Sequence, residues 1–223
     1  MAIEIYGKGR SVKGVLFDMD GVILDTEKLY ARFWAEAAQA LGYPMTYDQA
    51  LGMRSLNAQA GQAKLESYFG PGVSRPAMRD KRVELMDAYV EIHGVDLKPG
   101  IVPLLDALEA KRIPCAITTS SPLERVEKYL RPHGILQRFG KICTGYEVKR
   151  GKPAPDIYLY GAESLGLQAQ DCLAVEDSPA GIQSAYDAGC MAVLVPDLDG
   201  ATDEMKQRLF AQADSLADLI CLL

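Results

Sequence analysis

Short apolar runs alternate with longer amphipathic stretches along most of this 223-residue chain. The runs predicted to be strands, rich in apolar and β-branched residues, are 12–17, 113–119, 141–144, 172–175 and 191–195. Between them, apolar residues recur at helical spacing in segments 101–110, 123–130, 155–165 and 179–188. Because strands separated by helices pair in parallel through crossover connections, the pattern predicts an α/β fold with a parallel sheet and helices on both faces.

One segment, residues 27–95, breaks this alternation. It has no convincing strand and offers helical stretches near 29–41, 58–68 and 76–92, with a break at Gly70-Pro71-Gly72. An all-helical insertion after the first strand explains the interruption. We therefore expect a core domain made of residues 1–26 and 96–223, with an inserted helical domain at residues 27–95.

Composition and charge exclude several classes of partner. The formal net charge is −6, from 30 acidic and 24 basic residues, and no basic run favours nucleic acid or an acidic membrane surface. Residues 1–10 lack the apolar core of a signal peptide, and no apolar stretch reaches transmembrane length. Five scattered cysteines form no CxxC pair and are expected to be small buried hydrophobes. We expect a cytoplasmic protein that acts on a small molecule.

Pairs of carboxylates follow two of the predicted strands. Asp18 and Asp20 come after residues 12–17, and Glu176 and Asp177 come after residues 172–175. Like charges this close repel unless a cation or a proton lies between them. The arrangement suits a metal-assisted reaction in which one carboxylate attacks and another transfers protons, and hard oxygen ligands suit Mg2+. An acidic turn after a buried strand, or acidity favoured by a helix dipole, is the alternative interpretation.

A third strand end carries small hydroxyl groups in the string Thr119-Ser120-Ser121-Pro122. Here Ser121 is predicted to cap the following helix, with Pro122 in its first turn and Glu124 completing a capping box. Free amides and hydroxyls at a helix N-terminus also form a natural phosphate site. Local chemistry alone leaves capping and phosphate binding equally open.

Four strings resemble, in order, the motifs of the haloacid dehalogenase superfamily in its phosphatase branch. They are FDMDGVILDTE (17–27), ITTSSP (117–122), GKPAPD (151–156) and LAVEDSPAG (173–181). The β-phosphoglucomutase-like group of phosphatases and mutases is the most similar, since its members carry a helical cap after the first motif. The resemblance covers residues 12–196 and implies a Rossmann-like three-layer αβα core with an inserted all-helical cap.

The resemblance also implies roles for individual residues. Asp18 would be the nucleophile and Asp20 the acid/base, assisted by the hydroxyl of Thr119 and the ammonium of Lys152. The implied phosphate and substrate ligands are Asp18, Gly21, Thr26, Ser120, Lys152 and, in the cap, Arg54 and Lys81. Lys81 is assigned by spacing and not by a motif. The implied Mg2+ ligands are Asp18, the backbone carbonyl of Asp20, Asp177 and Glu176, the last either directly or through water.

These roles imply a magnesium-dependent phosphatase that hydrolyses a sugar or polyol phosphate through an aspartyl-phosphate intermediate, expected as a monomer. Mutases of the group have a histidine where this chain has Tyr30, and loss of that residue favours hydrolysis over rearrangement. A phosphomutase remains the first alternative. A true dehalogenase would lack an acid/base at Asp20, and a catalytically silent binding protein would have replaced one of Asp18, Asp20, Lys152 or Asp177.

Overall fold

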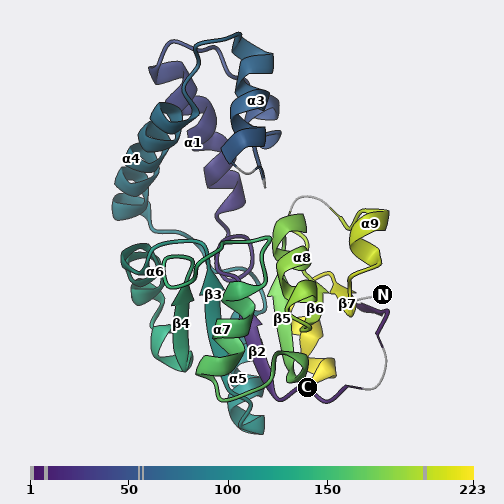
Figure 1. Ribbon diagram of the computed structural model, residues 1–223. Helices are drawn as coiled ribbons and strands as arrows, with labels where there is room; N and C mark the ends of the chain where they lie inside the picture. The colour runs from purple at the N-terminus through teal and green to yellow at the C-terminus, as the bar shows by residue number, and fades with distance from the viewer. Residues whose placement is uncertain (1–2, 8–9, 55, 57, 198–199) are drawn as a thin grey trace. The chain divides into compact units, whose positions relative to one another are not determined.

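The computed structural model describes residues 3–7, 10–54, 56, 58–197 and 200–223. The chain divides into two compact units (Figure 1). The core unit comprises Met1–Asp25 and Asp96–Leu223, and the helical unit comprises Thr26–Val95. The role of the helical unit as a cap remains a prediction.

A seven-stranded sheet forms the centre of the core unit, in the order β1-β7-β6-β5-β2-β3-β4. Neighbouring strands are parallel, except that β1 is antiparallel to β7. The strands are β1 (Ile3–Ile5), β2 (Gly14–Phe17), β3 (Cys115–Thr119), β4 (Lys141–Thr144), β5 (Cys172–Glu176), β6 (Met191–Leu194) and β7 (Ala211–Ala213). The five predicted strands are all present, whereas β1 and β7 were not predicted.

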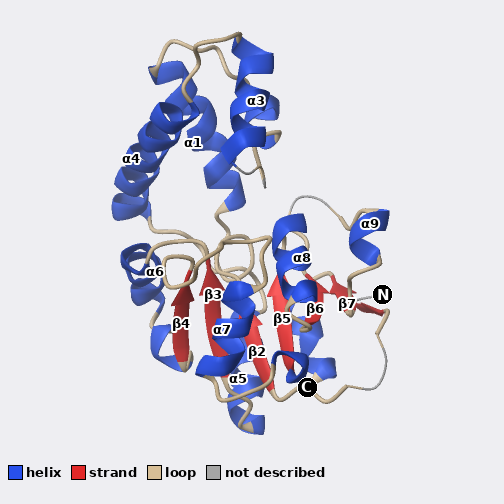
Figure 2. Ribbon diagram, viewed as in Figure 1, coloured by secondary structure: helices blue, strands red, loops and turns tan. Residues whose placement is uncertain are grey.

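Helices cover both faces of the sheet, so the predicted three-layer α/β class is confirmed. The described helices of this unit are α5 (Ile101–Lys111), α6 (Leu123–Leu130), α7 (Asp156–Ser164), α8 (Pro179–Asp187) and α9 (Asp203–Lys206), with 3-10 turns between several elements. On one face α7 packs against β2, β3 and β4, and α8 against β5 and β6, while α5 contacts the 3-10 segment η4 (Leu216–Leu222) (Figure 2).

Strand β2 lies at the centre of the sheet and is closely packed, which explains why its sequence is a continuous apolar run. Val15, Leu16 and Phe17 are fully buried, as expected for a parallel strand covered on both faces. Gly161 allows α7 to approach closely, since a Cβ there would lie 2.6 Å from Thr118 Cγ2. The carboxyl ends of β2, β3 and β5 are thereby held at one edge of a rigid sheet.

The helical unit contains α1 (Glu27–Ala40), α2 (Tyr47–Leu51), α3 (Ala58–Phe69) and α4 (Arg75–His93) among its described residues. The chain packs α1 against α4 and α2, around a core that includes Trp34, Leu65 and Met78. Helix α2 was not predicted; its N-terminus is set by a capping box between Thr46 and Gln49. Across the part of the chain that the structure describes, no helix is long and apolar enough to span a bilayer.

The cysteines follow the expected pattern with one exception. Cys115, Cys143, Cys172 and Cys190 are buried, but Cys221 near the C-terminus is exposed, so the prediction that all five are buried is wrong there. Burial raises the pKa of Cys115 to about 12 and that of Cys172 to about 11. Buried thiols of high pKa react slowly, because the thiolate is the reactive form.

We predict that an aromatic disulfide reagent titrates one thiol rapidly in the native protein and all five after denaturation. The release of the coloured thiolate measures both phases. Cys221→Ser is the control and should abolish the rapid phase alone. If a second thiol of the native wild-type protein, or any thiol of folded Cys221→Ser, reacted rapidly, the burial of the other four cysteines would be contradicted.

Candidate functional site

Three adjacent strands bring the predicted catalytic residues to one edge of the sheet. Strand β2 lies between β3 and β5, and Phe17 is in register with both Ile117 and Val175. The residues that follow these positions therefore lie level with one another: Asp18 after β2, Thr118 in β3 and Glu176 at the end of β5. Ligands of such sheets bind outside the carboxyl ends of the strands.

Lys152 connects these strand ends through its ammonium group. Its Nζ donates to Asp18 Oδ1 at 2.7 Å, to Glu176 Oε1 at 2.5 Å and to the backbone carbonyl of Thr118 at 3.0 Å. The side chain is 8% exposed, and those of Asp18 and Glu176 are 12% and 0% exposed. All three N–H donors of the ammonium are thus used. A lysine that precedes a proline usually lies in a solvated loop, but the ammonium of Lys152 is buried and fully hydrogen-bonded.

The protonation of this group follows from burial and charge. Burial alone would lower the pKa of Lys152, but attraction to Asp18 and Glu176 raises it above the usual value, so the ammonium stays charged. Burial raises the pKa of Asp18 to about 7, against the opposing effect of Lys152. A cation bound beside Asp18 would favour the ionised carboxylate that a nucleophile needs.

Glu176 is held on both of its carboxylate oxygens. Besides Lys152, its Oε1 accepts from Tyr158 Oη at 2.5 Å, and its Oε2 accepts from Ser178 Oγ at 3.2 Å and the Asp177 amide at 3.3 Å. The carboxylate also lies against the first turn of α8. A Cβ at Gly181 would fall 1.9 Å from Glu176 Cδ, so only glycine fits there.

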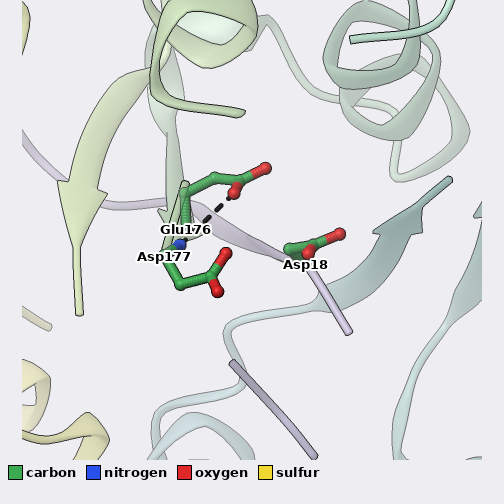
Figure 3. A group of neighbouring side chains, drawn as sticks. All are labelled: Asp18, Glu176 and Asp177. Atoms are coloured by element: carbon green, nitrogen blue, oxygen red, sulfur yellow. Dashed lines mark hydrogen bonds between the residues drawn. The ribbon is translucent and has the colours of Figure 1, made fainter. Parts of the chain in front are cut away.

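An acidic cluster at the same edge is formed by Asp18, Glu176 and Asp177 (Figure 3). Each offers a carboxylate oxygen, and these atoms all lie within 4.8 Å of one another. Hard oxygen donors gathered at this spacing fit a small divalent cation. The side chain of Asp20 is not part of the cluster, and the ligand predicted there was its backbone carbonyl.

Asp20 has a partner that the sequence did not indicate. Ser121 Oγ donates to Asp20 Oδ2 at 2.9 Å, and the Ser121 amide donates to Thr119 Oγ1 at 3.0 Å. The predicted cap at Ser121 is wrong, because α6 begins at Leu123 with Pro122 as its N-cap and has no side-chain capping bond. Since Ser121 lies one residue before the cap, its hydroxyl is directed to the acid/base candidate instead.

Two further predicted core residues, Gly21 and Ser120, follow the ends of β2 and β3 in the chain. Gly21 has a φ of 78°, the left-handed conformation that glycine tolerates, and its amide donates to the carbonyl of Leu24 in a tight turn. Ser120 is exposed. Tyr158 is a second residue that sequence reasoning missed. Its helical spacing marks a core position, but a buried tyrosine also needs a partner for its hydroxyl.

Three predicted substrate ligands belong to the helical unit and are described there. Thr26 is buried at the N-cap of α1. Arg54 Nε donates to the carbonyl of Leu51 at 2.9 Å, and its side chain lines a cavity within the unit. Lys81 Nζ donates to Glu84 Oε1 at 2.7 Å, and Lys81 does not line that cavity. The substrate role of Lys81 stays a prediction that no contact supports.

We predict that Ser121→Ala lowers kcat by roughly tenfold, because hydrogen bonds to charged groups are worth about 1.5–3 kcal/mol and part of that orients Asp20. Phosphate release measures the effect, and metal affinity should not change. Ser120→Ala is the matched control and should retain nearly full kcat, because it truncates an exposed hydroxyl and keeps the backbone amide, which is the implied phosphate ligand. Wild-type kcat in Ser121→Ala would show that Asp20 is positioned by other contacts.

Comparison with known proteins adds independent information. Residues 12–189 match the sequence model of haloacid dehalogenase-like hydrolases. The chain is 35% identical over 196 residues to protein CbbY of Rhodobacter capsulatus, covering 83% of this chain and 86% of the relative. It is 34% identical over 186 residues to hexitol phosphatase A of Escherichia coli K12, covering 82% of each. A β-phosphoglucomutase structure from Clostridium difficile shares the fold, with a TM-score of 0.74, 22% identity and 93% of each chain covered.

Proposed function

The chain belongs to the haloacid dehalogenase-like hydrolases, and we propose that it is a magnesium-dependent phosphatase acting through an aspartyl-phosphate intermediate. The family and the fold class predicted from the motifs are confirmed, as is the prediction of a hydrolase. The observation that carries the mechanistic proposal is the contact of Lys152 with Asp18 and Glu176, beside the hydrogen bond from Ser121 to Asp20.

In the first step, an oxygen of Asp18 attacks the phosphorus of the ester in line with the leaving oxygen. The new Asp18 O–P bond forms as the P–O bond to the alcohol breaks, and Asp20 gives its proton to the departing alkoxide. Lys152 holds Asp18 in place and neutralises charge on the phosphoryl group. Ser121 fixes the carboxylate of Asp20 for this transfer.

In the second step, Asp20 removes a proton from water, and the water oxygen attacks the same phosphorus. The Asp18 O–P bond breaks, inorganic phosphate leaves, and both carboxylates return to their starting states. The hydroxyl of Thr119 and the amide of Ser120 are proposed to bind the phosphoryl oxygens, as their place at the end of β3 suggests.

Mg2+ fits the acidic cluster, where Asp18, Asp177 and the carbonyl of Asp20 would hold it. When bound, the ion neutralises charge on the phosphoryl oxygens. Glu176 has a different role in this proposal. It anchors Lys152 through Oε1. Because both of its carboxylate oxygens already accept hydrogen bonds, it would bind the ion only through a water molecule.

We propose a sugar or polyol phosphate as the substrate, supported by the likeness to a relative named hexitol phosphatase. Tyr30, at the position of the mutase histidine, lies with its ring centroid 4.5 Å from the guanidinium carbon of Arg82. An aromatic residue held in this way offers no imidazole for a mutase. Product analysis decides between the alternatives: free phosphate supports hydrolysis, and interconverted sugar phosphates with little free phosphate would support a mutase.

We expect Asp18→Asn to abolish phosphate release, since the amide cannot attack phosphorus. For an alkyl phosphate, Asp20→Asn should lower kcat roughly 10²–10⁴-fold, the usual worth of a general acid/base. Coupled detection of inorganic phosphate measures both. Substantial turnover by Asp18→Asn would exclude the covalent mechanism, and a loss below about tenfold in Asp20→Asn would assign proton transfer to another residue.

Metal removal provides a separate prediction. Exhaustive dialysis against a chelator should abolish activity, and Mg2+ should restore it, whereas Ca2+ should inhibit because its larger, looser coordination shell disturbs the in-line geometry. Asp177→Asn removes one carboxylate of the cluster and should raise the Mg2+ concentration for half-maximal activity roughly tenfold or more. Full activity of the dialysed enzyme in chelator would refute the metal site.

A further inference from the structure

The backbone of the loop that carries Lys152 is fixed by two contacts away from the ammonium group. Ser184 Oγ, buried on α8, donates to the carbonyl of Ala154 at 2.6 Å. Arg150 donates to both carboxylate oxygens of Asp156, at 3.3 and 2.8 Å. The lysine side chain itself has a flexible four-carbon stem, so the position of its ammonium depends on the groups that accept its hydrogen bonds.

Tyr158, in the first turn of α7, contacts both members of the buried pair Lys152 and Glu176. Its hydroxyl donates to Glu176 Oε1 at 2.5 Å, the same oxygen that accepts from Lys152 Nζ. Its ring centroid lies 5.1 Å from Lys152 Nζ, within the range of a cation–π contact. One side chain therefore touches the ammonium with its ring and the counter-ion of that ammonium with its hydroxyl.

Packing explains the ring of Tyr158 but not its hydroxyl. The side chain is fully buried where α7 packs against β2 and β3 (Figure 1), and a phenylalanine would fill nearly the same space. Burying a hydroxyl costs free energy unless the group is hydrogen-bonded. Here the acceptor is the carboxylate that holds Lys152, so the polar atom lies where it acts on the ammonium.

The hydroxyl of Tyr158 sets how strongly Glu176 attracts Lys152. A carboxylate oxygen has two lone pairs, and Oε1 uses one for each of its two donors. Without the hydroxyl, the charge of Oε1 would act on the ammonium alone and draw it away from Asp18, which accepts from the same Nζ at 2.7 Å. Burial, together with the charges of Glu176 and Asp18, raises the pKa of Tyr158 well above its usual value, so the hydroxyl remains a donor.

We propose that Tyr158 is a positioning residue of the phosphatase reaction, whose hydroxyl shares Glu176 with Lys152 and so keeps the ammonium directed at Asp18. The inference rests on the proposed function, in which Lys152 holds Asp18 and neutralises charge on the phosphoryl group. Tyr158 itself touches neither the substrate nor the reacting atoms in this account. It acts on the rate of attack by fixing the position of the ammonium beside the nucleophile.

Tyr160, two residues further along α7, provides the matched control. Its hydroxyl donates to Glu147 Oε1 at 3.1 Å, and its ring centroid lies 5.9 Å from Lys141 Nζ. The same three types of side chain thus meet a second time on this helix, around a carboxylate that is not among the proposed catalytic or metal-binding groups. Tyr160→Phe removes an equivalent hydroxyl and should leave kcat near the wild-type value.

The first experiment compares phosphate release from an alkyl phosphate by the wild type, Tyr158→Phe and Tyr160→Phe at saturating Mg2+. Tyr158→Phe keeps the ring and should lower kcat roughly tenfold, because it removes a hydrogen bond to a charged group and part of that bond is expressed in the rate. Wild-type kcat in Tyr158→Phe, or an equal loss in Tyr160→Phe, would overturn the proposal.

Burst kinetics distinguish a positioning role from a merely structural one. In the Asp20→Asn background, an aryl phosphate should give a rapid first release of the aryl alcohol. The rate of this burst reports attack by Asp18, and its amplitude reports the fraction of competent protein. Adding Tyr158→Phe should slow the burst roughly tenfold and leave its amplitude unchanged. A lower amplitude at an unchanged rate would show that the hydroxyl only supports folding, and the proposal would be wrong.

NMR of the lysine side-chain nitrogens tests the contact without relying on catalysis. The buried ammonium of Lys152 should give a signal that Tyr158→Phe shifts and Tyr160→Phe does not. If the wild type releases no phosphate while this shift is observed, the proposed function fails and the Tyr158 contact stands. If phosphate is released but Tyr158→Phe changes neither the Lys152 signal nor the burst rate, the positioning role fails alone.

Discussion

The rest of the site depends on one ammonium group, Lys152 Nζ, which lies between two buried carboxylates. Burying Asp18 or Glu176 without a partner would cost several kcal/mol, and the lysine offsets that cost only in good geometry. The required precision comes from surrounding contacts: Tyr158 and the first turn of α8 hold Glu176, and the in-register strands hold Asp18. A rigid sheet edge thus holds the proposed nucleophile, its counter-ion and an acidic cluster together in the protein alone.

Much of this arrangement could be predicted from the sequence, for a physical reason. Parallel strands buried on both faces are continuous apolar runs, and polar residues at their carboxyl ends stand out against them. The short strand β7, Ala-Gln-Ala, carries no such signal, because its pairing with β6 and β1 is set by distant residues. The partner of Ser121 was unpredictable for the same reason, since Asp20 lies 101 residues away in the chain. The local sequence favoured a helix cap at Ser121, but in the fold its hydroxyl donates to Asp20 instead.

The helical unit shows a different limit of sequence reasoning. Among the cations of this unit, the sequence analysis singled out only Arg54 and Lys81, the second by spacing alone. The packing of α1, α3 and α4 instead gathers Arg75 and Arg82 beside two aromatic rings, while Lys81 pairs with Glu84 on its own helix. Which cations share a cavity depends on helix rotation and on one small residue, Gly61, where a Cβ would lie 2.4 Å from Arg75 Nε, and neither is visible in periodicity. The cations that share this cavity are therefore harder to predict than the residues at the strand ends.

The most direct test of the covalent account uses Asp20→Asn with an aryl phosphate. An aryl leaving group departs without an acid, but hydrolysis of the intermediate still needs the base, so the phosphorylated enzyme should accumulate. Acid quenching followed by peptide mass spectrometry should find one phosphoryl group on the peptide that contains Asp18, nearly one per chain. Release of the aryl alcohol over many turnovers with no phosphorylated peptide, or a phosphoryl group on another residue, would contradict the account.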